Sequence, residues 1–165
     1  MRKVRFLLCL AGLLYFAGAY GQNEKFKALF ICNFTNYIDW PGGATGSFVI
    51  AVMGDSPIIG ELQAIAKLKK VAGATIEVVK VNSASEIGNA NIVFVPAQKK
   101  KSLPDISQAL ANKYTLIITD NAPGNFGINL IEVDQKLAFQ ISKSNIESHK
   151  LKVNSSLIAL GTLVN

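Results

Sequence analysis

The chain has 165 residues, of which 50% are hydrophobic and 17% charged, and its formal net charge is +6. This length suits one domain with a single core and leaves too few residues for two. A mildly basic chain without a repeat of basic and aromatic residues gives no case for nucleic-acid binding.

The first 21 residues have the pattern of an export signal. A positive start precedes an apolar run over residues 6–16, and small side chains follow up to a favourable cleavage site before Gln22. The apolar run is too short to span a bilayer comfortably, and no later stretch approaches the roughly 20 apolar residues of a membrane helix. We expect a cleaved signal peptide (1–21) and a domain (22–165) exported to the periplasm; the alternative is an uncleaved anchor.

Residues 25–41 predict a packed helix with an aromatic face. Four side chains share one narrow arc of this helix: Phe26, Phe30, Phe34 and Tyr37. Asn33 lies in the middle of the arc, where an amide is costly unless it is hydrogen-bonded. We therefore predict that Asn33 is buried and bonds to the backbone of a neighbouring loop. The helix should end at Asp39-Trp40-Pro41, because proline cannot continue it.

Cys32 is the one cysteine that remains after export, so the mature chain cannot form an intramolecular disulfide. On the predicted helix it lies away from the aromatic arc. It is either a small residue beneath a neighbouring element or an exposed thiol able to cross-link a homodimer.

Strand-like and helical runs alternate further along the chain. Strands are predicted over residues 48–53, 75–81, 92–95 and 115–119, and helices over 58–68 and 103–112, with a short helix or turn over 83–89. This alternation predicts a single α/β domain with a mostly parallel sheet and helices on both faces. With the strands numbered along the chain, we expect the order 2-1-3-4.

The last third of the chain has a different pattern. Runs over 128–133 and 136–141 flank Asp134-Gln135, and this spacing predicts an antiparallel hairpin. A final helix follows, capped by Asn154 or Ser155, with one apolar stripe: Leu157, Leu160 and Val164.

Polar side chains follow two of the predicted parallel strands, where a ligand crevice forms in open α/β sheets. Asp55 and Ser56 come after the first strand, and Asp120 and Asn121 after the fourth. Two carboxylates on one rim could hold a cation or a polar ligand. The simpler interpretation is that Asp55 caps the following helix and Asp120 forms a turn.

No residue pattern for catalysis, a metal or a cofactor is present in the sequence. The glycine-rich phosphate-binding patterns G-x-G-x-x-G and G-x-x-x-x-G-K are missing. His149 is the one histidine and has no cysteine or carboxylate at ligand spacing, so we expect a solvated surface side chain. We therefore predict no catalytic residues, no metal site and no cofactor.

Two groups of lysines stand out. Lys99, Lys100 and Lys101 follow the third strand, and Lys67, Lys69 and Lys70 close the predicted helix over 58–68. Such groups are interpreted as solvated faces or as favourable charges at helix ends. The alternative is contact with an acidic partner or with lipid headgroups.

These blocks resemble the YfiR-like family of secreted bacterial proteins, whose opening helix follows K-A-x-x-x-x-N-F-x-x-Y-x-x-W-P. The matching residues here are Lys27, Ala28, Asn33, Phe34, Tyr37, Trp40 and Pro41. The likeness continues through residues 48–57, the Pro-Gly pair at 123–124, and the segments 127–142 and 151–164. It covers nearly the whole mature chain.

The resemblance implies a non-enzymatic regulator. The best-known member restrains a membrane-bound diguanylate cyclase from the periplasmic side, so the expected partner is the periplasmic part of an inner-membrane signalling protein. That member carries cysteine pairs that this chain lacks, which gives no support to a redox role here. The alternative function is a small-molecule-binding module at the crevice near Asp55 and Asp120, and an enzyme ranks third.

Overall fold

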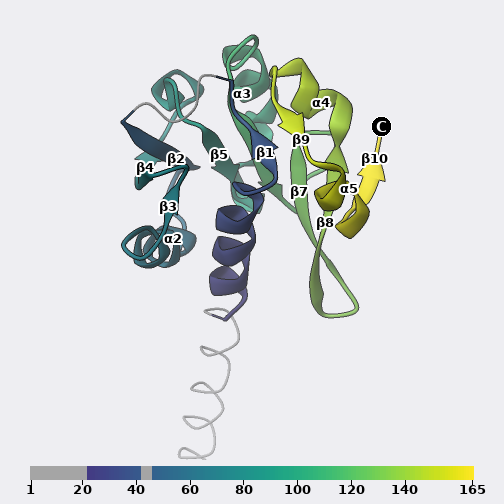
Figure 1. Cartoon of the computed structure of the whole chain (residues 1–165). Coiled ribbons are helices and arrows are strands. Elements are labelled where there is room, and N and C mark those ends of the chain that lie inside the picture. Colours follow the sequence, from purple (N-terminus) through teal and green to yellow (C-terminus); the bar gives the residue numbers. More distant parts are fainter. Residues whose placement is uncertain (1–21, 42–45) are drawn as a thin grey trace, which may run out of the picture.

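The computed structural model describes residues 22–41 and 46–165, so the predicted signal peptide lies outside the described residues. An eight-stranded sheet with the order β10-β8-β7-β6-β5-β2-β4-β3 forms the centre of the domain (Figure 1). Its parallel strands are, in spatial order, β4 (Ala74–Val81), β2 (Ser47–Met53), β5 (Ile92–Val95), β6 (Leu116–Asp120) and β7 (Ile128–Val133). The α/β class and the order 2-1-3-4 of the four predicted strands are confirmed.

The predicted hairpin is also confirmed. β8 (Lys136–Ser142) pairs antiparallel with β7, with Val133 opposite Lys136. Asp134 and Gln135 have φ values of 50° and 61°, and two positive φ values are the mark of a type I′ turn. The turn therefore forms without the glycine that such turns usually contain.

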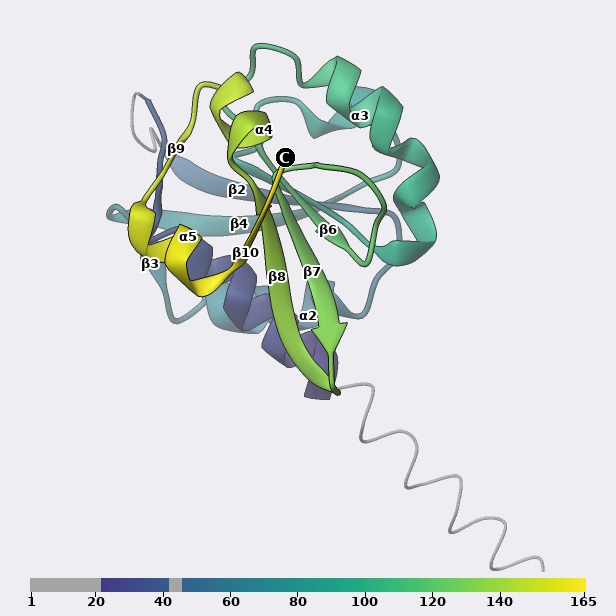
Figure 2. The same ribbon diagram turned by 90° about the vertical axis from the view of Figure 1, so that its right-hand side faces the viewer.

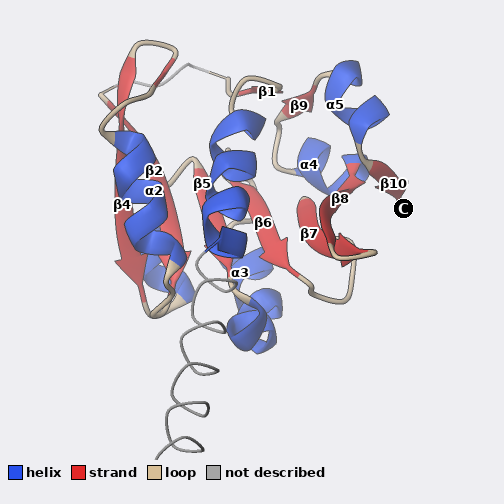
Figure 3. Ribbon diagram, turned by 90° about the horizontal axis from the view of Figure 1, so that it is seen from below, coloured by secondary structure: helices blue, strands red, loops and turns tan. Residues whose placement is uncertain are grey.

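Four strands were not predicted. β10 (Thr162–Val164) adds a parallel edge strand beside β8, and β3 (Lys70–Val71) pairs antiparallel with β4 at the other edge. β1 (Ile38–Asp39) and β9 (Lys152–Val153) form a separate two-stranded sheet. Figure 3 shows the main sheet extending from β4 at one side of the domain to β10 at the other.

Helices cover both faces of the sheet. The N-terminal helix (described over 22–34) and α2 (Ile58–Ala66) pack on one face, whereas α3 (Leu103–Ala109) and the 3-10 turn η1 (Ala84–Ile87) pack on the other (Figure 2). Shorter helical segments are η2 (Ala97–Ser102), α4 (Lys143–Ser148) and α5 (Ser155–Leu160). Among the described residues, no helix has the length and apolar character that a membrane span requires.

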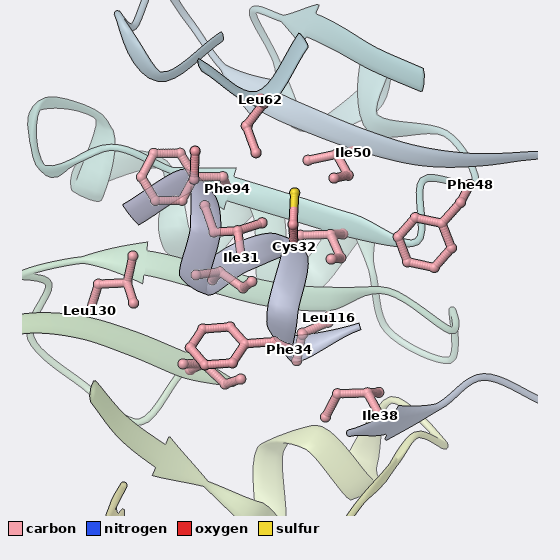
Figure 4. Packing of buried hydrophobic residues seen from close by; sticks show 14 of the residues in the cluster. Ile31, Cys32, Phe34, Ile38, Phe48, Ile50, Leu62, Phe94, Leu116 and Leu130 are labelled. Carbon is pink, nitrogen blue, oxygen red and sulfur yellow. The ribbon is translucent and has the colours of Figure 1, made fainter. Parts of the chain in front are cut away.

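Each face of the sheet has its own hydrophobic cluster, because side chains alternate between the faces along every strand. In β2, Ile50 and Val52 belong to the cluster beneath the N-terminal helix, whereas Ala51 and Met53 belong to the cluster beneath α3. Figure 4 shows Ile31, Cys32 and Phe34 of the N-terminal helix among the side chains of the first cluster. The same strands therefore supply side chains to both clusters.

The N-terminal helix buries a different face from the one predicted. Its buried side chains include Ala28, Ile31 and Cys32, whereas Asn33 is exposed. On a helical wheel Ile31 lies about 160° from Asn33. The prediction of a buried Asn33 is therefore wrong: its Oδ1 accepts a hydrogen bond of 3.1 Å from Lys69 Nζ, and this contact is exposed.

The aromatic arc instead turns partly toward β8. Phe30 and Phe34 contact Phe139 edge-to-face, with ring centroids 5.9 and 5.0 Å apart. Phe26, one turn earlier, is 47% exposed. The arc is therefore covered at its C-terminal end and open at its N-terminal end.

Four helix ends differ from the prediction, among them that of α3, which stops at Ala109 rather than at residue 112. The N-terminal helix ends at residue 34 rather than at Asp39, because Ile38 pairs with Val153 in the small sheet. The helix predicted over 58–68 stops at Ala66, which leaves Leu68 exposed. The predicted cap of the last helix is confirmed, since Asn154 Oδ1 accepts from the backbone N–H of Ser156. The stripe does not continue as expected, because Leu160 is exposed and Val164 lies in β10.

Candidate functional site

Asp55 and Asp120 both lie where parallel strands end, but each meets a different lysine. Asp55 Oδ1 is 2.8 Å from Lys80 Nζ, and the Asp55 side chain is 90% exposed. The hydrogen bond and charge of Lys80 lower the pKa of the Asp55 carboxyl. No side chain caps α2, so the predicted cap by Asp55 is wrong. The Ser56 carbonyl accepts from the N–H of Ile59 instead.

Asp120 attaches the N-terminal helix to the sheet. Its Oδ2 is 2.8 Å from Nζ of Lys27, which also contacts Glu24 Oε1 at 3.0 Å. Burial lowers the pKa of Lys27, but its hydrogen bonds and charge interactions with Asp120 and Glu24 together raise it above 10.5. The adjacent Asn121 has a φ of 48°, as in a turn. Ligand binding by Asp55, Ser56, Asp120 and Asn121 stays a prediction.

The buried amide of this fold is Asn129, which the sequence reasoning missed. Its Oδ1 accepts from the Thr119 hydroxyl at 2.8 Å and from the Ala122 N–H at 3.1 Å. Its Nδ2 donates to the Ala122 carbonyl at 3.1 Å and to Gln140 Oε1 at 3.0 Å. An asparagine inside the apolar strand pattern over 128–133 was the signal that could have found it. It links three neighbouring strands.

Two predictions about titratable side chains are now decided by burial. Cys32 is 3% exposed, so the interpretation as a small covered residue is confirmed, and burial raises its pKa to about 11. His149 is 4% exposed, so the prediction of a solvated histidine is wrong. Its Nδ1 lies 3.1 Å from the carbonyl oxygen of Leu110, which follows α3. The same carbonyl also accepts from the N–H of Lys113 at 2.9 Å, so His149 makes a second polar contact at this helix end.

The lysine groups are exposed, as interpreted. Lys99, Lys100 and Lys101 lie in η2, and Lys67, Lys69 and Lys70 lie at and beyond the end of α2. The Lys99 side chain covers Gly54 so closely that a β-carbon there would overlap it. In the described part of the chain, no three side chains of histidine, cysteine, aspartate or glutamate gather closely enough to hold a metal ion.

A large groove lies between the start of the N-terminal helix and the tip of the β7–β8 hairpin, which are side by side in Figures 1 and 2. Its volume is about 770 Å³, and its apolar lining comes from Phe26, Phe30 and Leu137. Polar side chains form its rim, among them Glu132 and Lys136. We call this feature the hairpin groove.

A smaller cleft of about 380 Å³ lies at the opposite end of the parallel strands, where β5 and β6 begin. We call it the Trp40 cleft. It is lined by Trp40, Pro41, Asn89, Asn91, Asn112, Lys113, Tyr114 and Thr115. Trp40 and Pro41 belong to the opening motif, whereas the other lining residues come from the loops before β5 and β6, which sequence reasoning did not single out.

The described chain is thus a single α/β domain with a mostly parallel sheet, an antiparallel hairpin and two surface hollows at opposite ends of the strands. A family model described as YfiR/HmsC-like matches residues 24–162. The chain belongs to this family. A comparison with curated proteins gives no match.

Proposed function

We propose that this protein is an exported, non-enzymatic regulator that acts in the periplasm by docking to the periplasmic part of an inner-membrane signalling protein. Membership of the YfiR/HmsC-like family supports this function, and the regulated enzyme is then a membrane-bound diguanylate cyclase. The regulator binds its partner directly and carries out no chemistry on it.

The observation that supports docking is the hairpin groove. Phe26 is 47% exposed at its wall and Val133 is 49% exposed near the hairpin tip. An exposed apolar hollow with a polar rim is the form that protein-docking sites take. Its occupant is an apolar side chain from the partner's periplasmic part, which would rest against Phe26 and Leu137.

The experiment compares Phe26→Lys with Leu68→Lys. Leu68 is a matched control, because it is an 87% exposed apolar residue beyond α2 and does not line the groove. Fully burying a phenylalanine contributes about 1.5–3 kcal/mol, so Phe26→Lys should weaken capture of the membrane partner roughly tenfold or more. Leu68→Lys should leave it unchanged.

The two variants are tested in cells that lack the wild-type protein. Cross-linking followed by identification of the captured membrane protein measures docking, and cellular cyclic di-GMP measures regulation. Circular dichroism confirms that both variants fold. Equal capture and equal cyclic di-GMP in the two strains would contradict docking through the groove, and capture of no membrane signalling protein by the wild type would contradict the function.

A further inference from the structure

The Trp40 cleft is held in shape by hydrogen bonds from its own lining. The side-chain Oδ1 of Asn91 accepts from the N–H of Val49 at 2.9 Å, and the carbonyl oxygen of Asn91 accepts from Trp40 Nε1 at 3.3 Å. The Thr115 hydroxyl donates to the Ala90 carbonyl at 2.6 Å. These contacts hold Trp40, Asn91 and Thr115 in place, so a ligand would meet a preformed site.

The two aromatic side chains of the cleft, Trp40 and Tyr114, each contact a side chain that does not line the cleft. The Trp40 indole packs edge-to-face on Phe48, with ring centroids 5.0 Å apart. Tyr114 is 46% exposed, and Lys150 Nζ lies 5.9 Å from the centroid of its ring. The cleft therefore presents a fixed indole and an accessible phenol ring to an incoming ligand.

Three carboxamides complete the lining. Asn89 and Asn112 are exposed, and Asn91 is half-buried with its Oδ1 already used. An amide offers two N–H donors and an acceptor oxygen, so these side chains can bind hydroxyl groups in either direction. Carboxamides beside aromatic rings match a molecule that has an apolar face and a rim of hydroxyls.

The charge of the cleft decides between ligand classes. Lys113 is its one charged lining residue, with Nζ 2.8 Å from the Gly88 carbonyl oxygen, and the ammonium of Lys150 lies by Tyr114. Aromatic rings alone would favour a cationic ligand, because the face of a ring attracts positive charge. Two ammonium groups at the cleft disfavour a cationic ligand and accept a neutral or negatively charged one.

We propose that the Trp40 cleft binds a small saccharide that is neutral or carries a carboxylate. The apolar face of the sugar ring stacks on the aromatic side chains, and its hydroxyls bond to the carboxamides. The cleft volume of about 380 Å³ falls within the range of about 300–1,000 Å³ that is usual for small-ligand sites. This site is independent of the hairpin groove and of the proposed docking.

Trp40 is the single tryptophan of the chain, so intrinsic tryptophan fluorescence reports on this cleft alone. The folded protein is titrated with glucose, N-acetylglucosamine and glucuronate to about 50 mM, well above a Kd of about 1 mM that corresponds to roughly 4 kcal/mol of binding. Sodium acetate is the control for a carboxylate without a sugar ring. At least one saccharide should give a saturable change, and acetate should not.

Three variants test the assignment. Tyr114→Ala removes an aromatic wall, and Asn112→Gly removes an amide while keeping a backbone with φ 64° that glycine adopts freely. Asp134→Gly is the matched control, because Asp134 also has a positive φ and lies in the β7–β8 turn, away from the cleft. The first two should weaken the saccharide response at least tenfold, and the control should leave it unchanged.

Three results would overturn the proposal. The first is the lack of a saturable response to all three sugars in the wild-type protein. The second is a response to acetate as strong as that to glucuronate. The third is a saccharide response that Tyr114→Ala and Asn112→Gly leave intact.

Discussion

The amide of Asn129 is the polar group that holds β6, β7 and β8 in register on one face of the sheet. It is 6% exposed and makes four hydrogen bonds, two of them to the backbone of Ala122 in the turn after β6. Because all its bonding groups are satisfied, the amide stabilises the fold rather than weakening it. Removing it would leave several buried partners without a bond.

The same substitution at two asparagines tests this difference. Asn129→Leu should destabilise the protein by about 3–5 kcal/mol, because the Ala122 N–H and the Thr119 hydroxyl remain buried without partners. Asn33→Leu should change the free energy of unfolding by less than about 0.5 kcal/mol, because Asn33 is exposed. Urea unfolding measures both. A larger loss of stability in Asn33→Leu than in Asn129→Leu would contradict the burial assigned to the two side chains.

The buried thiol of Cys32 makes the free energy of unfolding depend on pH in the alkaline range. Burial raises its pKa to about 11 from 9.0, and the charge of Lys69 opposes this shift. The folded state therefore binds its thiol proton more tightly than the unfolded state. The contribution is complete below about pH 9 and is lost as the pH rises toward 11, on the order of 2–3 kcal/mol in total.

Cys32→Ala should remove this part of the pH dependence. Urea unfolding of both proteins from pH 8 to 11 isolates the effect of the thiol, because every other ionisable group is common to both proteins. The stability difference between wild type and variant should shrink as the pH rises. A constant difference across the range would contradict the buried thiol.

At the scale of elements, the Lys27–Asp120 pair connects the N-terminal helix to β6. Both side chains are largely buried, with exposures of 10% and 18%. Asp120→Ala should destabilise the protein by about 2–4 kcal/mol, because it leaves a buried ammonium with Glu24 as its remaining partner.

Asp55→Ala is the matched control for Asp120→Ala, because Asp55 forms an exposed pair with Lys80. Exposed ion pairs contribute little, so the unfolding midpoint should not move. Thermal unfolding of the two variants makes the comparison, and equal midpoints would show that Lys27 does not depend on Asp120. Because Asp120→Ala should also destabilise the fold, a loss of ligand binding in this variant could not be assigned to the missing carboxylate alone.

The regular elements of the sheet could be predicted because their signals are local. β-branched runs gave β4, β5 and β7, and the spacing around Asp134-Gln135 gave the hairpin. The buried face of the N-terminal helix could not be predicted in the same way, because this helix is apolar on most sides. Small and aliphatic residues of the helix are almost fully buried in the core, while Phe30 and Phe34 contact Phe139 of β8, and periodicity alone does not rank these two faces.

At the scale of the whole molecule, both candidate surfaces combine residues that are distant in the sequence. The hairpin groove joins the N-terminal helix to β7 and β8, and the Trp40 cleft joins the end of β1 to the loops before β5 and β6. No local motif marks such a surface, and the ligand crevice predicted at Asp55 and Asp120 is a separate place that stays a prediction. Topology alone brings these residues together.

The two hollows lie at opposite ends of the strands of one sheet, share no lining residue, and should act independently. Substitutions at separate sites without common partners combine to within about 0.3–0.5 kcal/mol. Tyr114→Ala should therefore leave partner capture at the wild-type level, and Phe26→Lys should leave the fluorescence response of Trp40 to saccharide unchanged. The double variant should lose both. If a saccharide weakened partner capture, and Tyr114→Ala abolished that effect, the sheet would couple the Trp40 cleft to the hairpin groove, and the saccharide would be a signal that releases the partner.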